Sequence, residues 1–388
     1  MLLSVAGCVT SKPLLITAAP AVEAARPDAG NVPHAAVRWY TTFWQALADI
    51  NLESAWVMAD SEEQRRLVDS IELFLNGKDH AADSALTPLL TSRDSIVQNA
   101  ARITYGGLLT SEGNWSRLAA YADSAKHGAG DAAGVETWAP AFKGVNTTVT
   151  FDDSISSVPL IRTASGIATV PVMVNGVTRH FWIDTGSSIT ILTQAVADAA
   201  GVAGIGGDTL QLVTSVGRLP TRAAVVKILK VAGVTVTNAR AMIVSGSALQ
   251  MRELASGRPP EEIDGVIGFD LIRSLDLSID DVRDQVVIRK PVLRPDDPKN
   301  PRNLSWFGVP IVTLLSETGA AVHLALDTGA EESFGTPSMA RKSHAPWRRA
   351  ERQTVQGFGG SKPESGIVIP SVQLYLGDVP LELKRIFL

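Results

Sequence analysis

The tripeptide Asp-Thr-Gly occurs twice in this chain of 388 residues, each time directly after a short apolar segment. The copies begin at Asp184 and Asp327, so they lie 143 residues apart. Each apolar segment is typical of a β-strand, and a turn upstream pairs it with a preceding strand: Asn175-Gly176 for the first copy and a turn ending at Gly319 for the second. This repetition predicts two tandem β lobes of the same design.

Two aspartates at contact distance can hydrolyse an amide without a metal ion or a covalent intermediate. One carboxylate takes a proton from water, while the other carboxyl group, as the acid, polarises the carbonyl. Like charges at that distance do not both ionise comfortably, so such a pair shares one proton. We therefore predict that Asp184 and Asp327 are paired catalytic carboxylates.

The residues around the aspartates are predicted to support the two loops. A threonine hydroxyl in each motif can form hydrogen bonds across a pseudo-twofold axis, and a glycine allows the backbone to pass close to the carboxylates. The predicted supporting residues are Thr185, Gly186, Ser187, Thr328, Gly329 and Ala330.

From about residue 159 to residue 388 the sequence resembles the retropepsin-like aspartic peptidases, the bacterial branch in particular. The first lobe carries the resemblance through its Asn-Gly hairpin, Asp-Thr-Gly motif, a Val-Ala-Gly-Val turn at 231–234 and Asp264-Gly265 before an apolar pair. The resemblance implies that Val266, Ile267 and Gly268 form a strand crossing behind the aspartate loop, with a short helix after it.

The resemblance also implies a mobile hairpin, or flap, over the substrate in each lobe. Gly217 follows Asp184 by 33 residues and Gly357 follows Asp327 by 30, and Gly359 lies beside the second of these positions. Glycines allow such a hairpin to bend and to approach a substrate backbone. The substrate expected between flaps and aspartates is an extended polypeptide.

The second lobe departs from this pattern near its end. The lobes stay in register to the turns at Gly233 and Gly377, but the counterpart of Gly268 would fall at about residue 411, beyond Leu388. We expect a C-terminally truncated second lobe that leaves apolar strand residues such as Val372 exposed, or else a minimal lobe completed by dimerisation. The alternative function is therefore a catalytically impaired peptide-binding or scaffolding protein of the same fold.

Residues 35–128 show helical periodicity. We expect five helices, near 35–59, 61–75, 80–90, 94–109 and 115–125. The turn glycines Gly77 and Gly113 are 36 residues apart, which is similar to stacked tetratricopeptide hairpins, although a generic helical bundle gives the same periodicity. This domain is predicted to dock a protein partner or to position another part of the molecule.

The predicted fold is a multidomain α + β chain, in which this helical domain precedes an all-β bilobal acid-protease fold. The lobes are expected at residues 138–290 and 302–388, separated by a proline-rich linker. Residues 1–34 have the composition of a flexible tether. Val5-Ala6-Gly7-Cys8 resembles a bacterial lipobox, which predicts a lipid anchor on Cys8 and a location in the cell envelope; a chance run of small residues is the alternative. We expect the natural start to lie upstream of Met1.

Composition excludes several other classes of function. A net charge of −5 gives no basic surface for nucleic acid. The single cysteine allows neither an internal disulfide nor a cysteine zinc cluster, and no metal or cofactor is expected. No apolar run reaches the length of a membrane-spanning helix. Neither a Gly-x-Ser-x-Gly nucleophile motif nor a phosphate-binding glycine loop is present.

Overall fold

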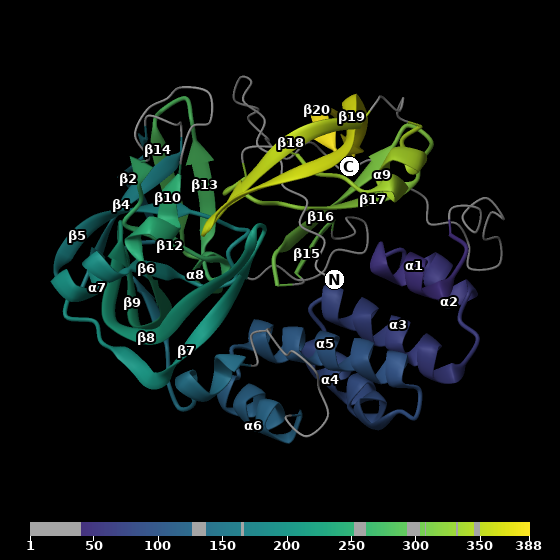
Figure 1. Cartoon of the computed structure of the whole chain (residues 1–388), viewed down its shortest axis with the longest axis horizontal. Coiled ribbons are helices and arrows are strands. Elements are labelled where there is room, and N and C mark those ends of the chain that lie inside the picture. The colour runs from purple at the N-terminus through teal and green to yellow at the C-terminus, as the bar shows by residue number, and fades with distance from the viewer. Residues whose placement is uncertain are drawn as a thin grey trace.

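The computed structural model of the chain describes residues 40–125, 137–163, 167–251, 261–292, 303–306, 308–330, 333–344 and 350–388. Cys8 and most of both predicted linkers lie outside these residues. A helical region is followed by two β-rich lobes (Figure 1). Among the described helices, none combines the length and apolar character needed to cross a membrane.

The helical region contains six α-helices within the described residues. Their bounds are α1 Phe43–Ala48, α2 Leu52–Val57, α3 Glu62–Leu75, α4 Asp79–Leu86, α5 Ser95–Glu112 and α6 Trp115–Ala125, with a 3-10 turn at Thr87–Thr91 after α4. The single helix expected from 35 to 59 is wrong over its described part. Ile50 has a positive φ of 55°, and the Asn51 side chain caps a new helix by accepting from the Ser54 amide at 3.0 Å, so the chain breaks between α1 and α2.

Glycine ends the two longest of these helices. Gly77 (φ 67°) follows the last residues of α3, and Gly113 (φ 68°) caps α5. Both positions lie in the left-handed region, where a residue without Cβ terminates a helix at low cost. The likeness of the two resulting hairpins to tetratricopeptide repeats remains a prediction.

The first lobe is built on a nine-stranded sheet with the order β1-β9-β6-β12-β5-β4-β8-β7, in which β3 pairs with β4. Its strands are β1 Thr148–Phe151, β3 Ile161–Arg162, β4 Ala168–Val174, β5 Val177–Ile183, β6 Ile191–Thr193, β7 Gly204–Thr214, β8 Gly217–Val231, β9 Val234–Val244 and β12 Gly265–Ile267. The lobe also contains α7 Gln194–Ala199, α8 Phe269–Ile272 and the sheet of β2 Ile155–Pro159, β13 Asp276–Asp280 and β14 Gln285–Arg289. A short pair, β10 Gln250–Met251 and β11 Glu261–Glu262, completes it.

Strand β12 crosses directly behind the first aspartate. It lies parallel to β5, with Val266 opposite Trp182 and Ile267 opposite Ile183. A Cβ on Gly268 would lie 2.5 Å from the carbonyl oxygen of Ile189, so only glycine allows this close crossing. The strand is therefore fixed against the segment that follows the Asp184 loop.

The second lobe repeats most of this plan in a six-stranded sheet. Its elements are β15 Leu304–Trp306, β16 Pro310–Ser316, β17 Ala321–Ala325, α9 Pro337–Lys342, β18 Ala350–Gly357, β19 Gly360–Leu376 and β20 Val379–Phe387. Strand β17 leads to Asp327 as β5 leads to Asp184. Among the described strands, β17 pairs with β16 and has no neighbour in the place that β12 takes beside β5.

The expected exposure of apolar strand residues in the second lobe is wrong. Val372 and Leu374 are 3% and 0% exposed, and Ile386 and Phe387 are equally buried. The β19–β20 hairpin closes over Met339 and Ala340 of α9, and this places the apolar side of both strands in a core of their own. The last strand is thus a packed element of the lobe.

Candidate active site

The two Asp-Thr-Gly loops bind each other symmetrically between the lobes. The Thr185 amide donates to Thr328 Oγ1 at 3.1 Å, and the Thr328 amide donates to Thr185 Oγ1 at 3.0 Å. Each hydroxyl in turn donates to a carbonyl of the opposite lobe at 2.7 Å, Thr185 to Leu326 and Thr328 to Ile183. Four hydrogen bonds therefore join the strand ends that carry the aspartates.

Backbone amides orient both carboxylates. Asp184 Oδ1 accepts from the amides of Gly186 at 2.8 Å and Ser187 at 3.2 Å. Asp327 Oδ1 accepts from the Gly329 amide at 2.8 Å. In both lobes the carboxylate accepts from the amide of the motif glycine, so the two carboxylates occupy corresponding positions; Asp184 has the Ser187 amide as a second donor.

Each motif glycine lies against the carboxylate of the other lobe. A Cβ on Gly186 would be 2.5 Å from Asp327 Oδ1, and a Cβ on Gly329 would be 2.5 Å from Asp184 Cγ. Real Cβ atoms do not approach other atoms so closely. The absence of a side chain at these two positions is thus what allows Asp184 and Asp327 to meet.

Asp184 is buried, with 5% of its surface exposed. Burial raises its pKa well above the ordinary value, and the charge of Asp327 and a hydrogen bond with that carboxyl group raise it further. The amides of Gly186 and Ser187 act in the opposite direction but are weaker. Asp184 therefore keeps its proton at a pH where an exposed aspartate would have lost it.

Strand β12 and helix α8 hold the Asp184 loop from behind. The Asp184 amide donates to the Ile267 carbonyl at 3.1 Å, and the Phe269 amide donates to the Ser187 carbonyl at 2.7 Å. Thr190 Oγ1 donates to Asp270 Oδ1 at 3.0 Å, and burial raises the pKa of Asp270 to about 6. Sequence reasoning missed Thr190 and Asp270, although an acid two residues after the crossing glycine was a visible signal.

The hairpin tips of the two lobes meet each other. The β7–β8 turn contains Ser215, and a Cβ on Gly357 at the end of β18 would overlap its Oγ. The tip of the β18–β19 hairpin reaches across to the first lobe (Figure 1), where the Gly359 amide donates to the Ala248 carbonyl at 2.9 Å. Gly217 and Gly359 have positive φ values of 154° and 94° at these turns.

Phe358 anchors the second tip beside the aspartate strand. Its ring contacts the Trp182 ring edge to face, with centroids 5.7 Å apart. Trp182 stands two residues before Asp184 in β5, and Phe358 packs against the same core cluster. The tip therefore covers the apolar surface next to the carboxylates, a contact that sequence reasoning did not predict.

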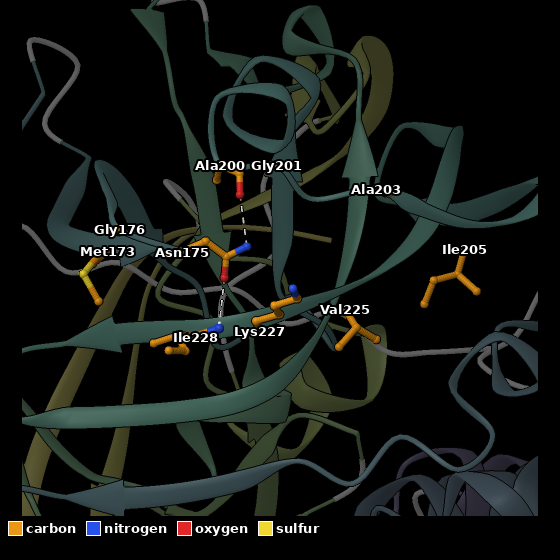
Figure 2. Close-up of a pocket in the computed structure, with 10 residues that line it drawn as sticks. All are labelled: Met173, Asn175, Gly176, Ala200, Gly201, Ala203, Ile205, Val225, Lys227 and Ile228. Carbon is orange, nitrogen blue, oxygen red and sulfur yellow. Dashed lines mark hydrogen bonds between the residues drawn. The ribbon is translucent and has the colours of Figure 1, made fainter.

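A separate hollow of about 730 Å³ lies on the first lobe near the Asn175-Gly176 turn (Figure 2). The Asn175 side chain braces it, because Nδ2 donates to the Ala200 carbonyl and Oδ1 accepts from the Ile228 amide, both at 3.0 Å. No residue lining this hollow belongs to the Asp-Thr-Gly loops or to the hairpin tips. Within the described residues, no group of His, Cys, Asp and Glu is arranged to hold a metal ion.

Comparison with known proteins finds a family match around the first aspartate. Residues 170–271 match the family model described as aspartyl protease, and this segment contains Asp184 and strand β12. The solved structure of a retropepsin-like aspartic protease from Rickettsia conorii is similar at 15% identity, over 37% of this chain and 94% of that chain, with a TM-score of 0.24. No curated protein matches the chain.

Residues 170–271 are thus similar to the aspartyl protease family. The family expected from the sequence is confirmed at the level of the aspartyl protease model for residues 170–271, and the predicted order of a helical region before a β-rich region is confirmed as well.

The hydrogen bonds exchanged by Thr185 and Thr328 give a first testable prediction. In Thr185→Ala the Leu326 carbonyl loses its donor and the Thr328 amide loses its acceptor, and we expect a destabilisation of about 1–3 kcal/mol. Chemical denaturation measures this loss. Thr185→Ser keeps the hydroxyl and should retain most of the stability; equal destabilisation by Ala and Ser would assign the effect to packing of the methyl group instead.

Proposed function

We propose that this chain is an aspartic endopeptidase that hydrolyses extended polypeptides. The observation that supports this most directly is the meeting of two carboxylates, Asp184 buried and Asp327 half-buried, each oriented by its own loop amide and lying against the glycine of the other lobe. Such a pair provides an acid and a base at one point, which is what water-activating hydrolysis requires.

In the proposed reaction a water molecule lies between the carboxyl groups. The ionised carboxylate takes a proton from this water while the water oxygen attacks the peptide carbonyl carbon. The protonated carboxyl group donates its proton to the carbonyl oxygen. The raised pKa of Asp184 favours it as the initial acid. The tetrahedral intermediate, a gem-diol, collapses when its C–N bond breaks and the amine leaves with the proton held by the pair. As the carbonyl re-forms, one hydroxyl of the gem-diol returns its proton to the pair, which restores the single shared proton.

The hairpin tips set how a substrate enters. In this proposal the tips close over the carboxylates, which the bond from Gly359 to Ala248 and the packing of Phe358 on Trp182 support. An extended peptide must displace these contacts and can then bond to the exposed strand edges. This accounts for the glycines at both turns, which allow the hairpins to bend.

The test of this function is cleavage of a diverse peptide mixture by the full chain, followed by mass spectrometry of new termini from acidic to neutral pH. Specific cleavage that a transition-state analogue with a tetrahedral hydroxyl-bearing centre blocks is the expected result. Tight binding of peptides by a well-folded sample without any cleavage would instead favour the alternative, a peptide-binding or scaffolding protein of this fold.

The activity of the pair and its contribution to stability should both fall as pH rises. Cleavage needs one proton on the pair, so it should be lost as pH rises through the raised pKa of Asp184. The folded state also binds this proton more tightly than the unfolded chain, whose aspartates titrate near pH 3.9. The resulting contribution to stability is complete below that pH and is lost as pH rises towards the folded pKa.

Calorimetric melting of the parent and of Asp184→Asn from pH 3 to pH 8 measures this contribution. Asp270 also has a raised pKa and adds a slope of the same sign to both proteins, so their difference isolates Asp184. We expect the variant to gain stability relative to the parent as pH rises. A difference that does not change with pH would contradict the raised pKa.

The lipid anchor on Cys8, the envelope location and a protein partner of the helical region remain predictions from the sequence.

A further inference from the structure

The described strands of the two lobes do not share a sheet. Each of the four sheets draws its strands from one lobe alone. Direct contacts between the described parts of the lobes include the hydrogen bonds exchanged by Thr185 and Thr328, the hairpin tips and a ring contact between Phe269 and Trp306, whose centroids are 5.1 Å apart. All of these lie at or next to the site that must open for a substrate.

Two arginines of the first lobe contact the helical region. Arg273 Nη1 donates to the carbonyl oxygens of Thr110 at 3.2 Å and of Ser111, in the last turn of α5. These carbonyls carry the negative end of the helix dipole, which favours a cation. Arg240 lies over the Trp115 ring of α6, 4.9 Å from its centroid. Gly113 leaves room for this approach, because a Cβ there would lie 3.2 Å from Arg273 Nη2.

The helical region contacts the second lobe through a buried lysine. Lys342 of α9 is 3% exposed, and its Nζ lies 3.9 Å from Asp49 Oδ2 and 5.5 Å from the Tyr40 ring centroid, both at the first helix. The Tyr40 hydroxyl donates to the same Asp49 oxygen at 3.0 Å. Helix α3 also lies against β15 of this lobe. Figure 1 shows the helices along one side of both lobes.

Arg273 and Lys342 both belong to segments that contact the aspartate loops or the strands leading to them. Arg273 follows α8, whose Phe269 amide binds the Ser187 carbonyl of the first loop. Lys342 Nζ donates at 3.0 Å to the carbonyl of Ala321, the first residue of the strand that leads to Asp327. A buried cation that loses its partners is costly, so these contacts resist separation of the helices from either lobe.

We propose that the helical region is a clamp between the lobes, in which Arg273 and Lys342 are positioning residues that fix the orientation of one lobe relative to the other and hence of Asp184 relative to Asp327. The clamp does not depend on the hairpin tips, so it can hold the carboxylates in place while the tips open. Only its consequence for catalysis rests on the proposed function.

The test measures the arrangement of the lobes directly in the full chain. In a Cys8→Ser background, spin labels at Lys227→Cys in the first lobe and Gln373→Cys in the second report the distance between lobes by pulsed electron resonance; both positions are exposed. Arg273→Met with Lys342→Met should broaden this distance distribution. A label pair within the first lobe, Lys227→Cys with Val282→Cys, should be unchanged.

Arg283→Met with Lys384→Met is the matched control, because these residues pair with Asp280 and Glu382 of their own lobes. An unchanged distribution between lobes, or equal broadening within the first lobe, would overturn the clamp. If the double variant does not fold, the single variants Arg273→Lys and Lys342→Arg are measured in its place. Each should broaden the same distance distribution to a smaller extent. The distances decide the proposal whether or not the chain cleaves peptides.

For an active chain, the double Met variant should lower kcat on the order of 10-fold to 100-fold, since small displacements of reacting groups are costly. The Arg283→Met, Lys384→Met control should keep the kcat of the parent. A loss confined to KM would contradict a role in placing the aspartates.

Discussion

Replacing Asp184 by Asn should lower peptide cleavage by about 10³-fold or more, because the pair loses the group that alternates between acid and base. Asn keeps the oxygen that accepts from the Gly186 and Ser187 amides, so the loop should stay in place. The parent carboxyl group is buried beside another carboxyl group, which disfavours its charged form. We therefore expect the variant to be as stable as the parent, or more stable near neutral pH.

Initial rates and thermal unfolding on the same samples test both parts of this prediction. Asp281→Asn is the control, because Asp281 is exposed and pairs with Arg162 far from the loops. Asp327→Asn should match Asp184→Asn, and the double variant should lose little more, since the two groups act as a unit. Equal cleavage by Asp184→Asn and the parent would refute the assignment of the pair.

Gly186→Ala should be the most damaging change that adds a single methyl group to the site. Its Cβ would overlap the Asp327 carboxylate, so the lobes must separate or the carboxylate must turn away from its partner. A displacement of about 1 Å at reacting groups costs on the order of 10²-fold in rate, and we expect a loss of at least that size. Gly329→Ala should act in the same way through Asp184.

Gly246→Ala provides the matched control. No atom lies within 4 Å of a Cβ built there, and its φ is outside the left-handed region, so activity should stay close to that of the parent. Kinetics and a crystal structure of Gly186→Ala would show whether the carboxylates have moved apart. Full activity in Gly186→Ala would mean that the pair does not need the close approach described above.

The motif itself was readable from the sequence because its requirements are local. A strand end, a carboxylate, a hydroxyl and a residue without Cβ lie within three positions, and their repetition made chance a poor explanation. The crossing strand at Val266 to Gly268 was equally visible as an apolar pair before glycine. The break at Ile50 was missed, since helical periodicity continues on both sides of a single residue with positive φ.

Contacts between distant segments were not readable in this way. Arg273 and the carbonyl of Thr110 are 163 residues apart, and nothing in the sequence distinguishes this arginine from a surface residue. The same holds for Lys342, whose burial depends on helix α1 lying against the second lobe. The contact between Phe358 and Trp182 could not be predicted either, because it depends on where the folded hairpin lies.

The sequence by itself determined the chemistry that this chain can offer, because the residue types and spacing of the two motifs state which groups can share a proton. The tertiary structure alone decided which surfaces are buried. Val372 and Leu374 are core residues because β19 and β20 close over α9, a consequence of long-range pairing. It also decided that the helices join both lobes, since burial and charge pairing depend on how separate elements meet.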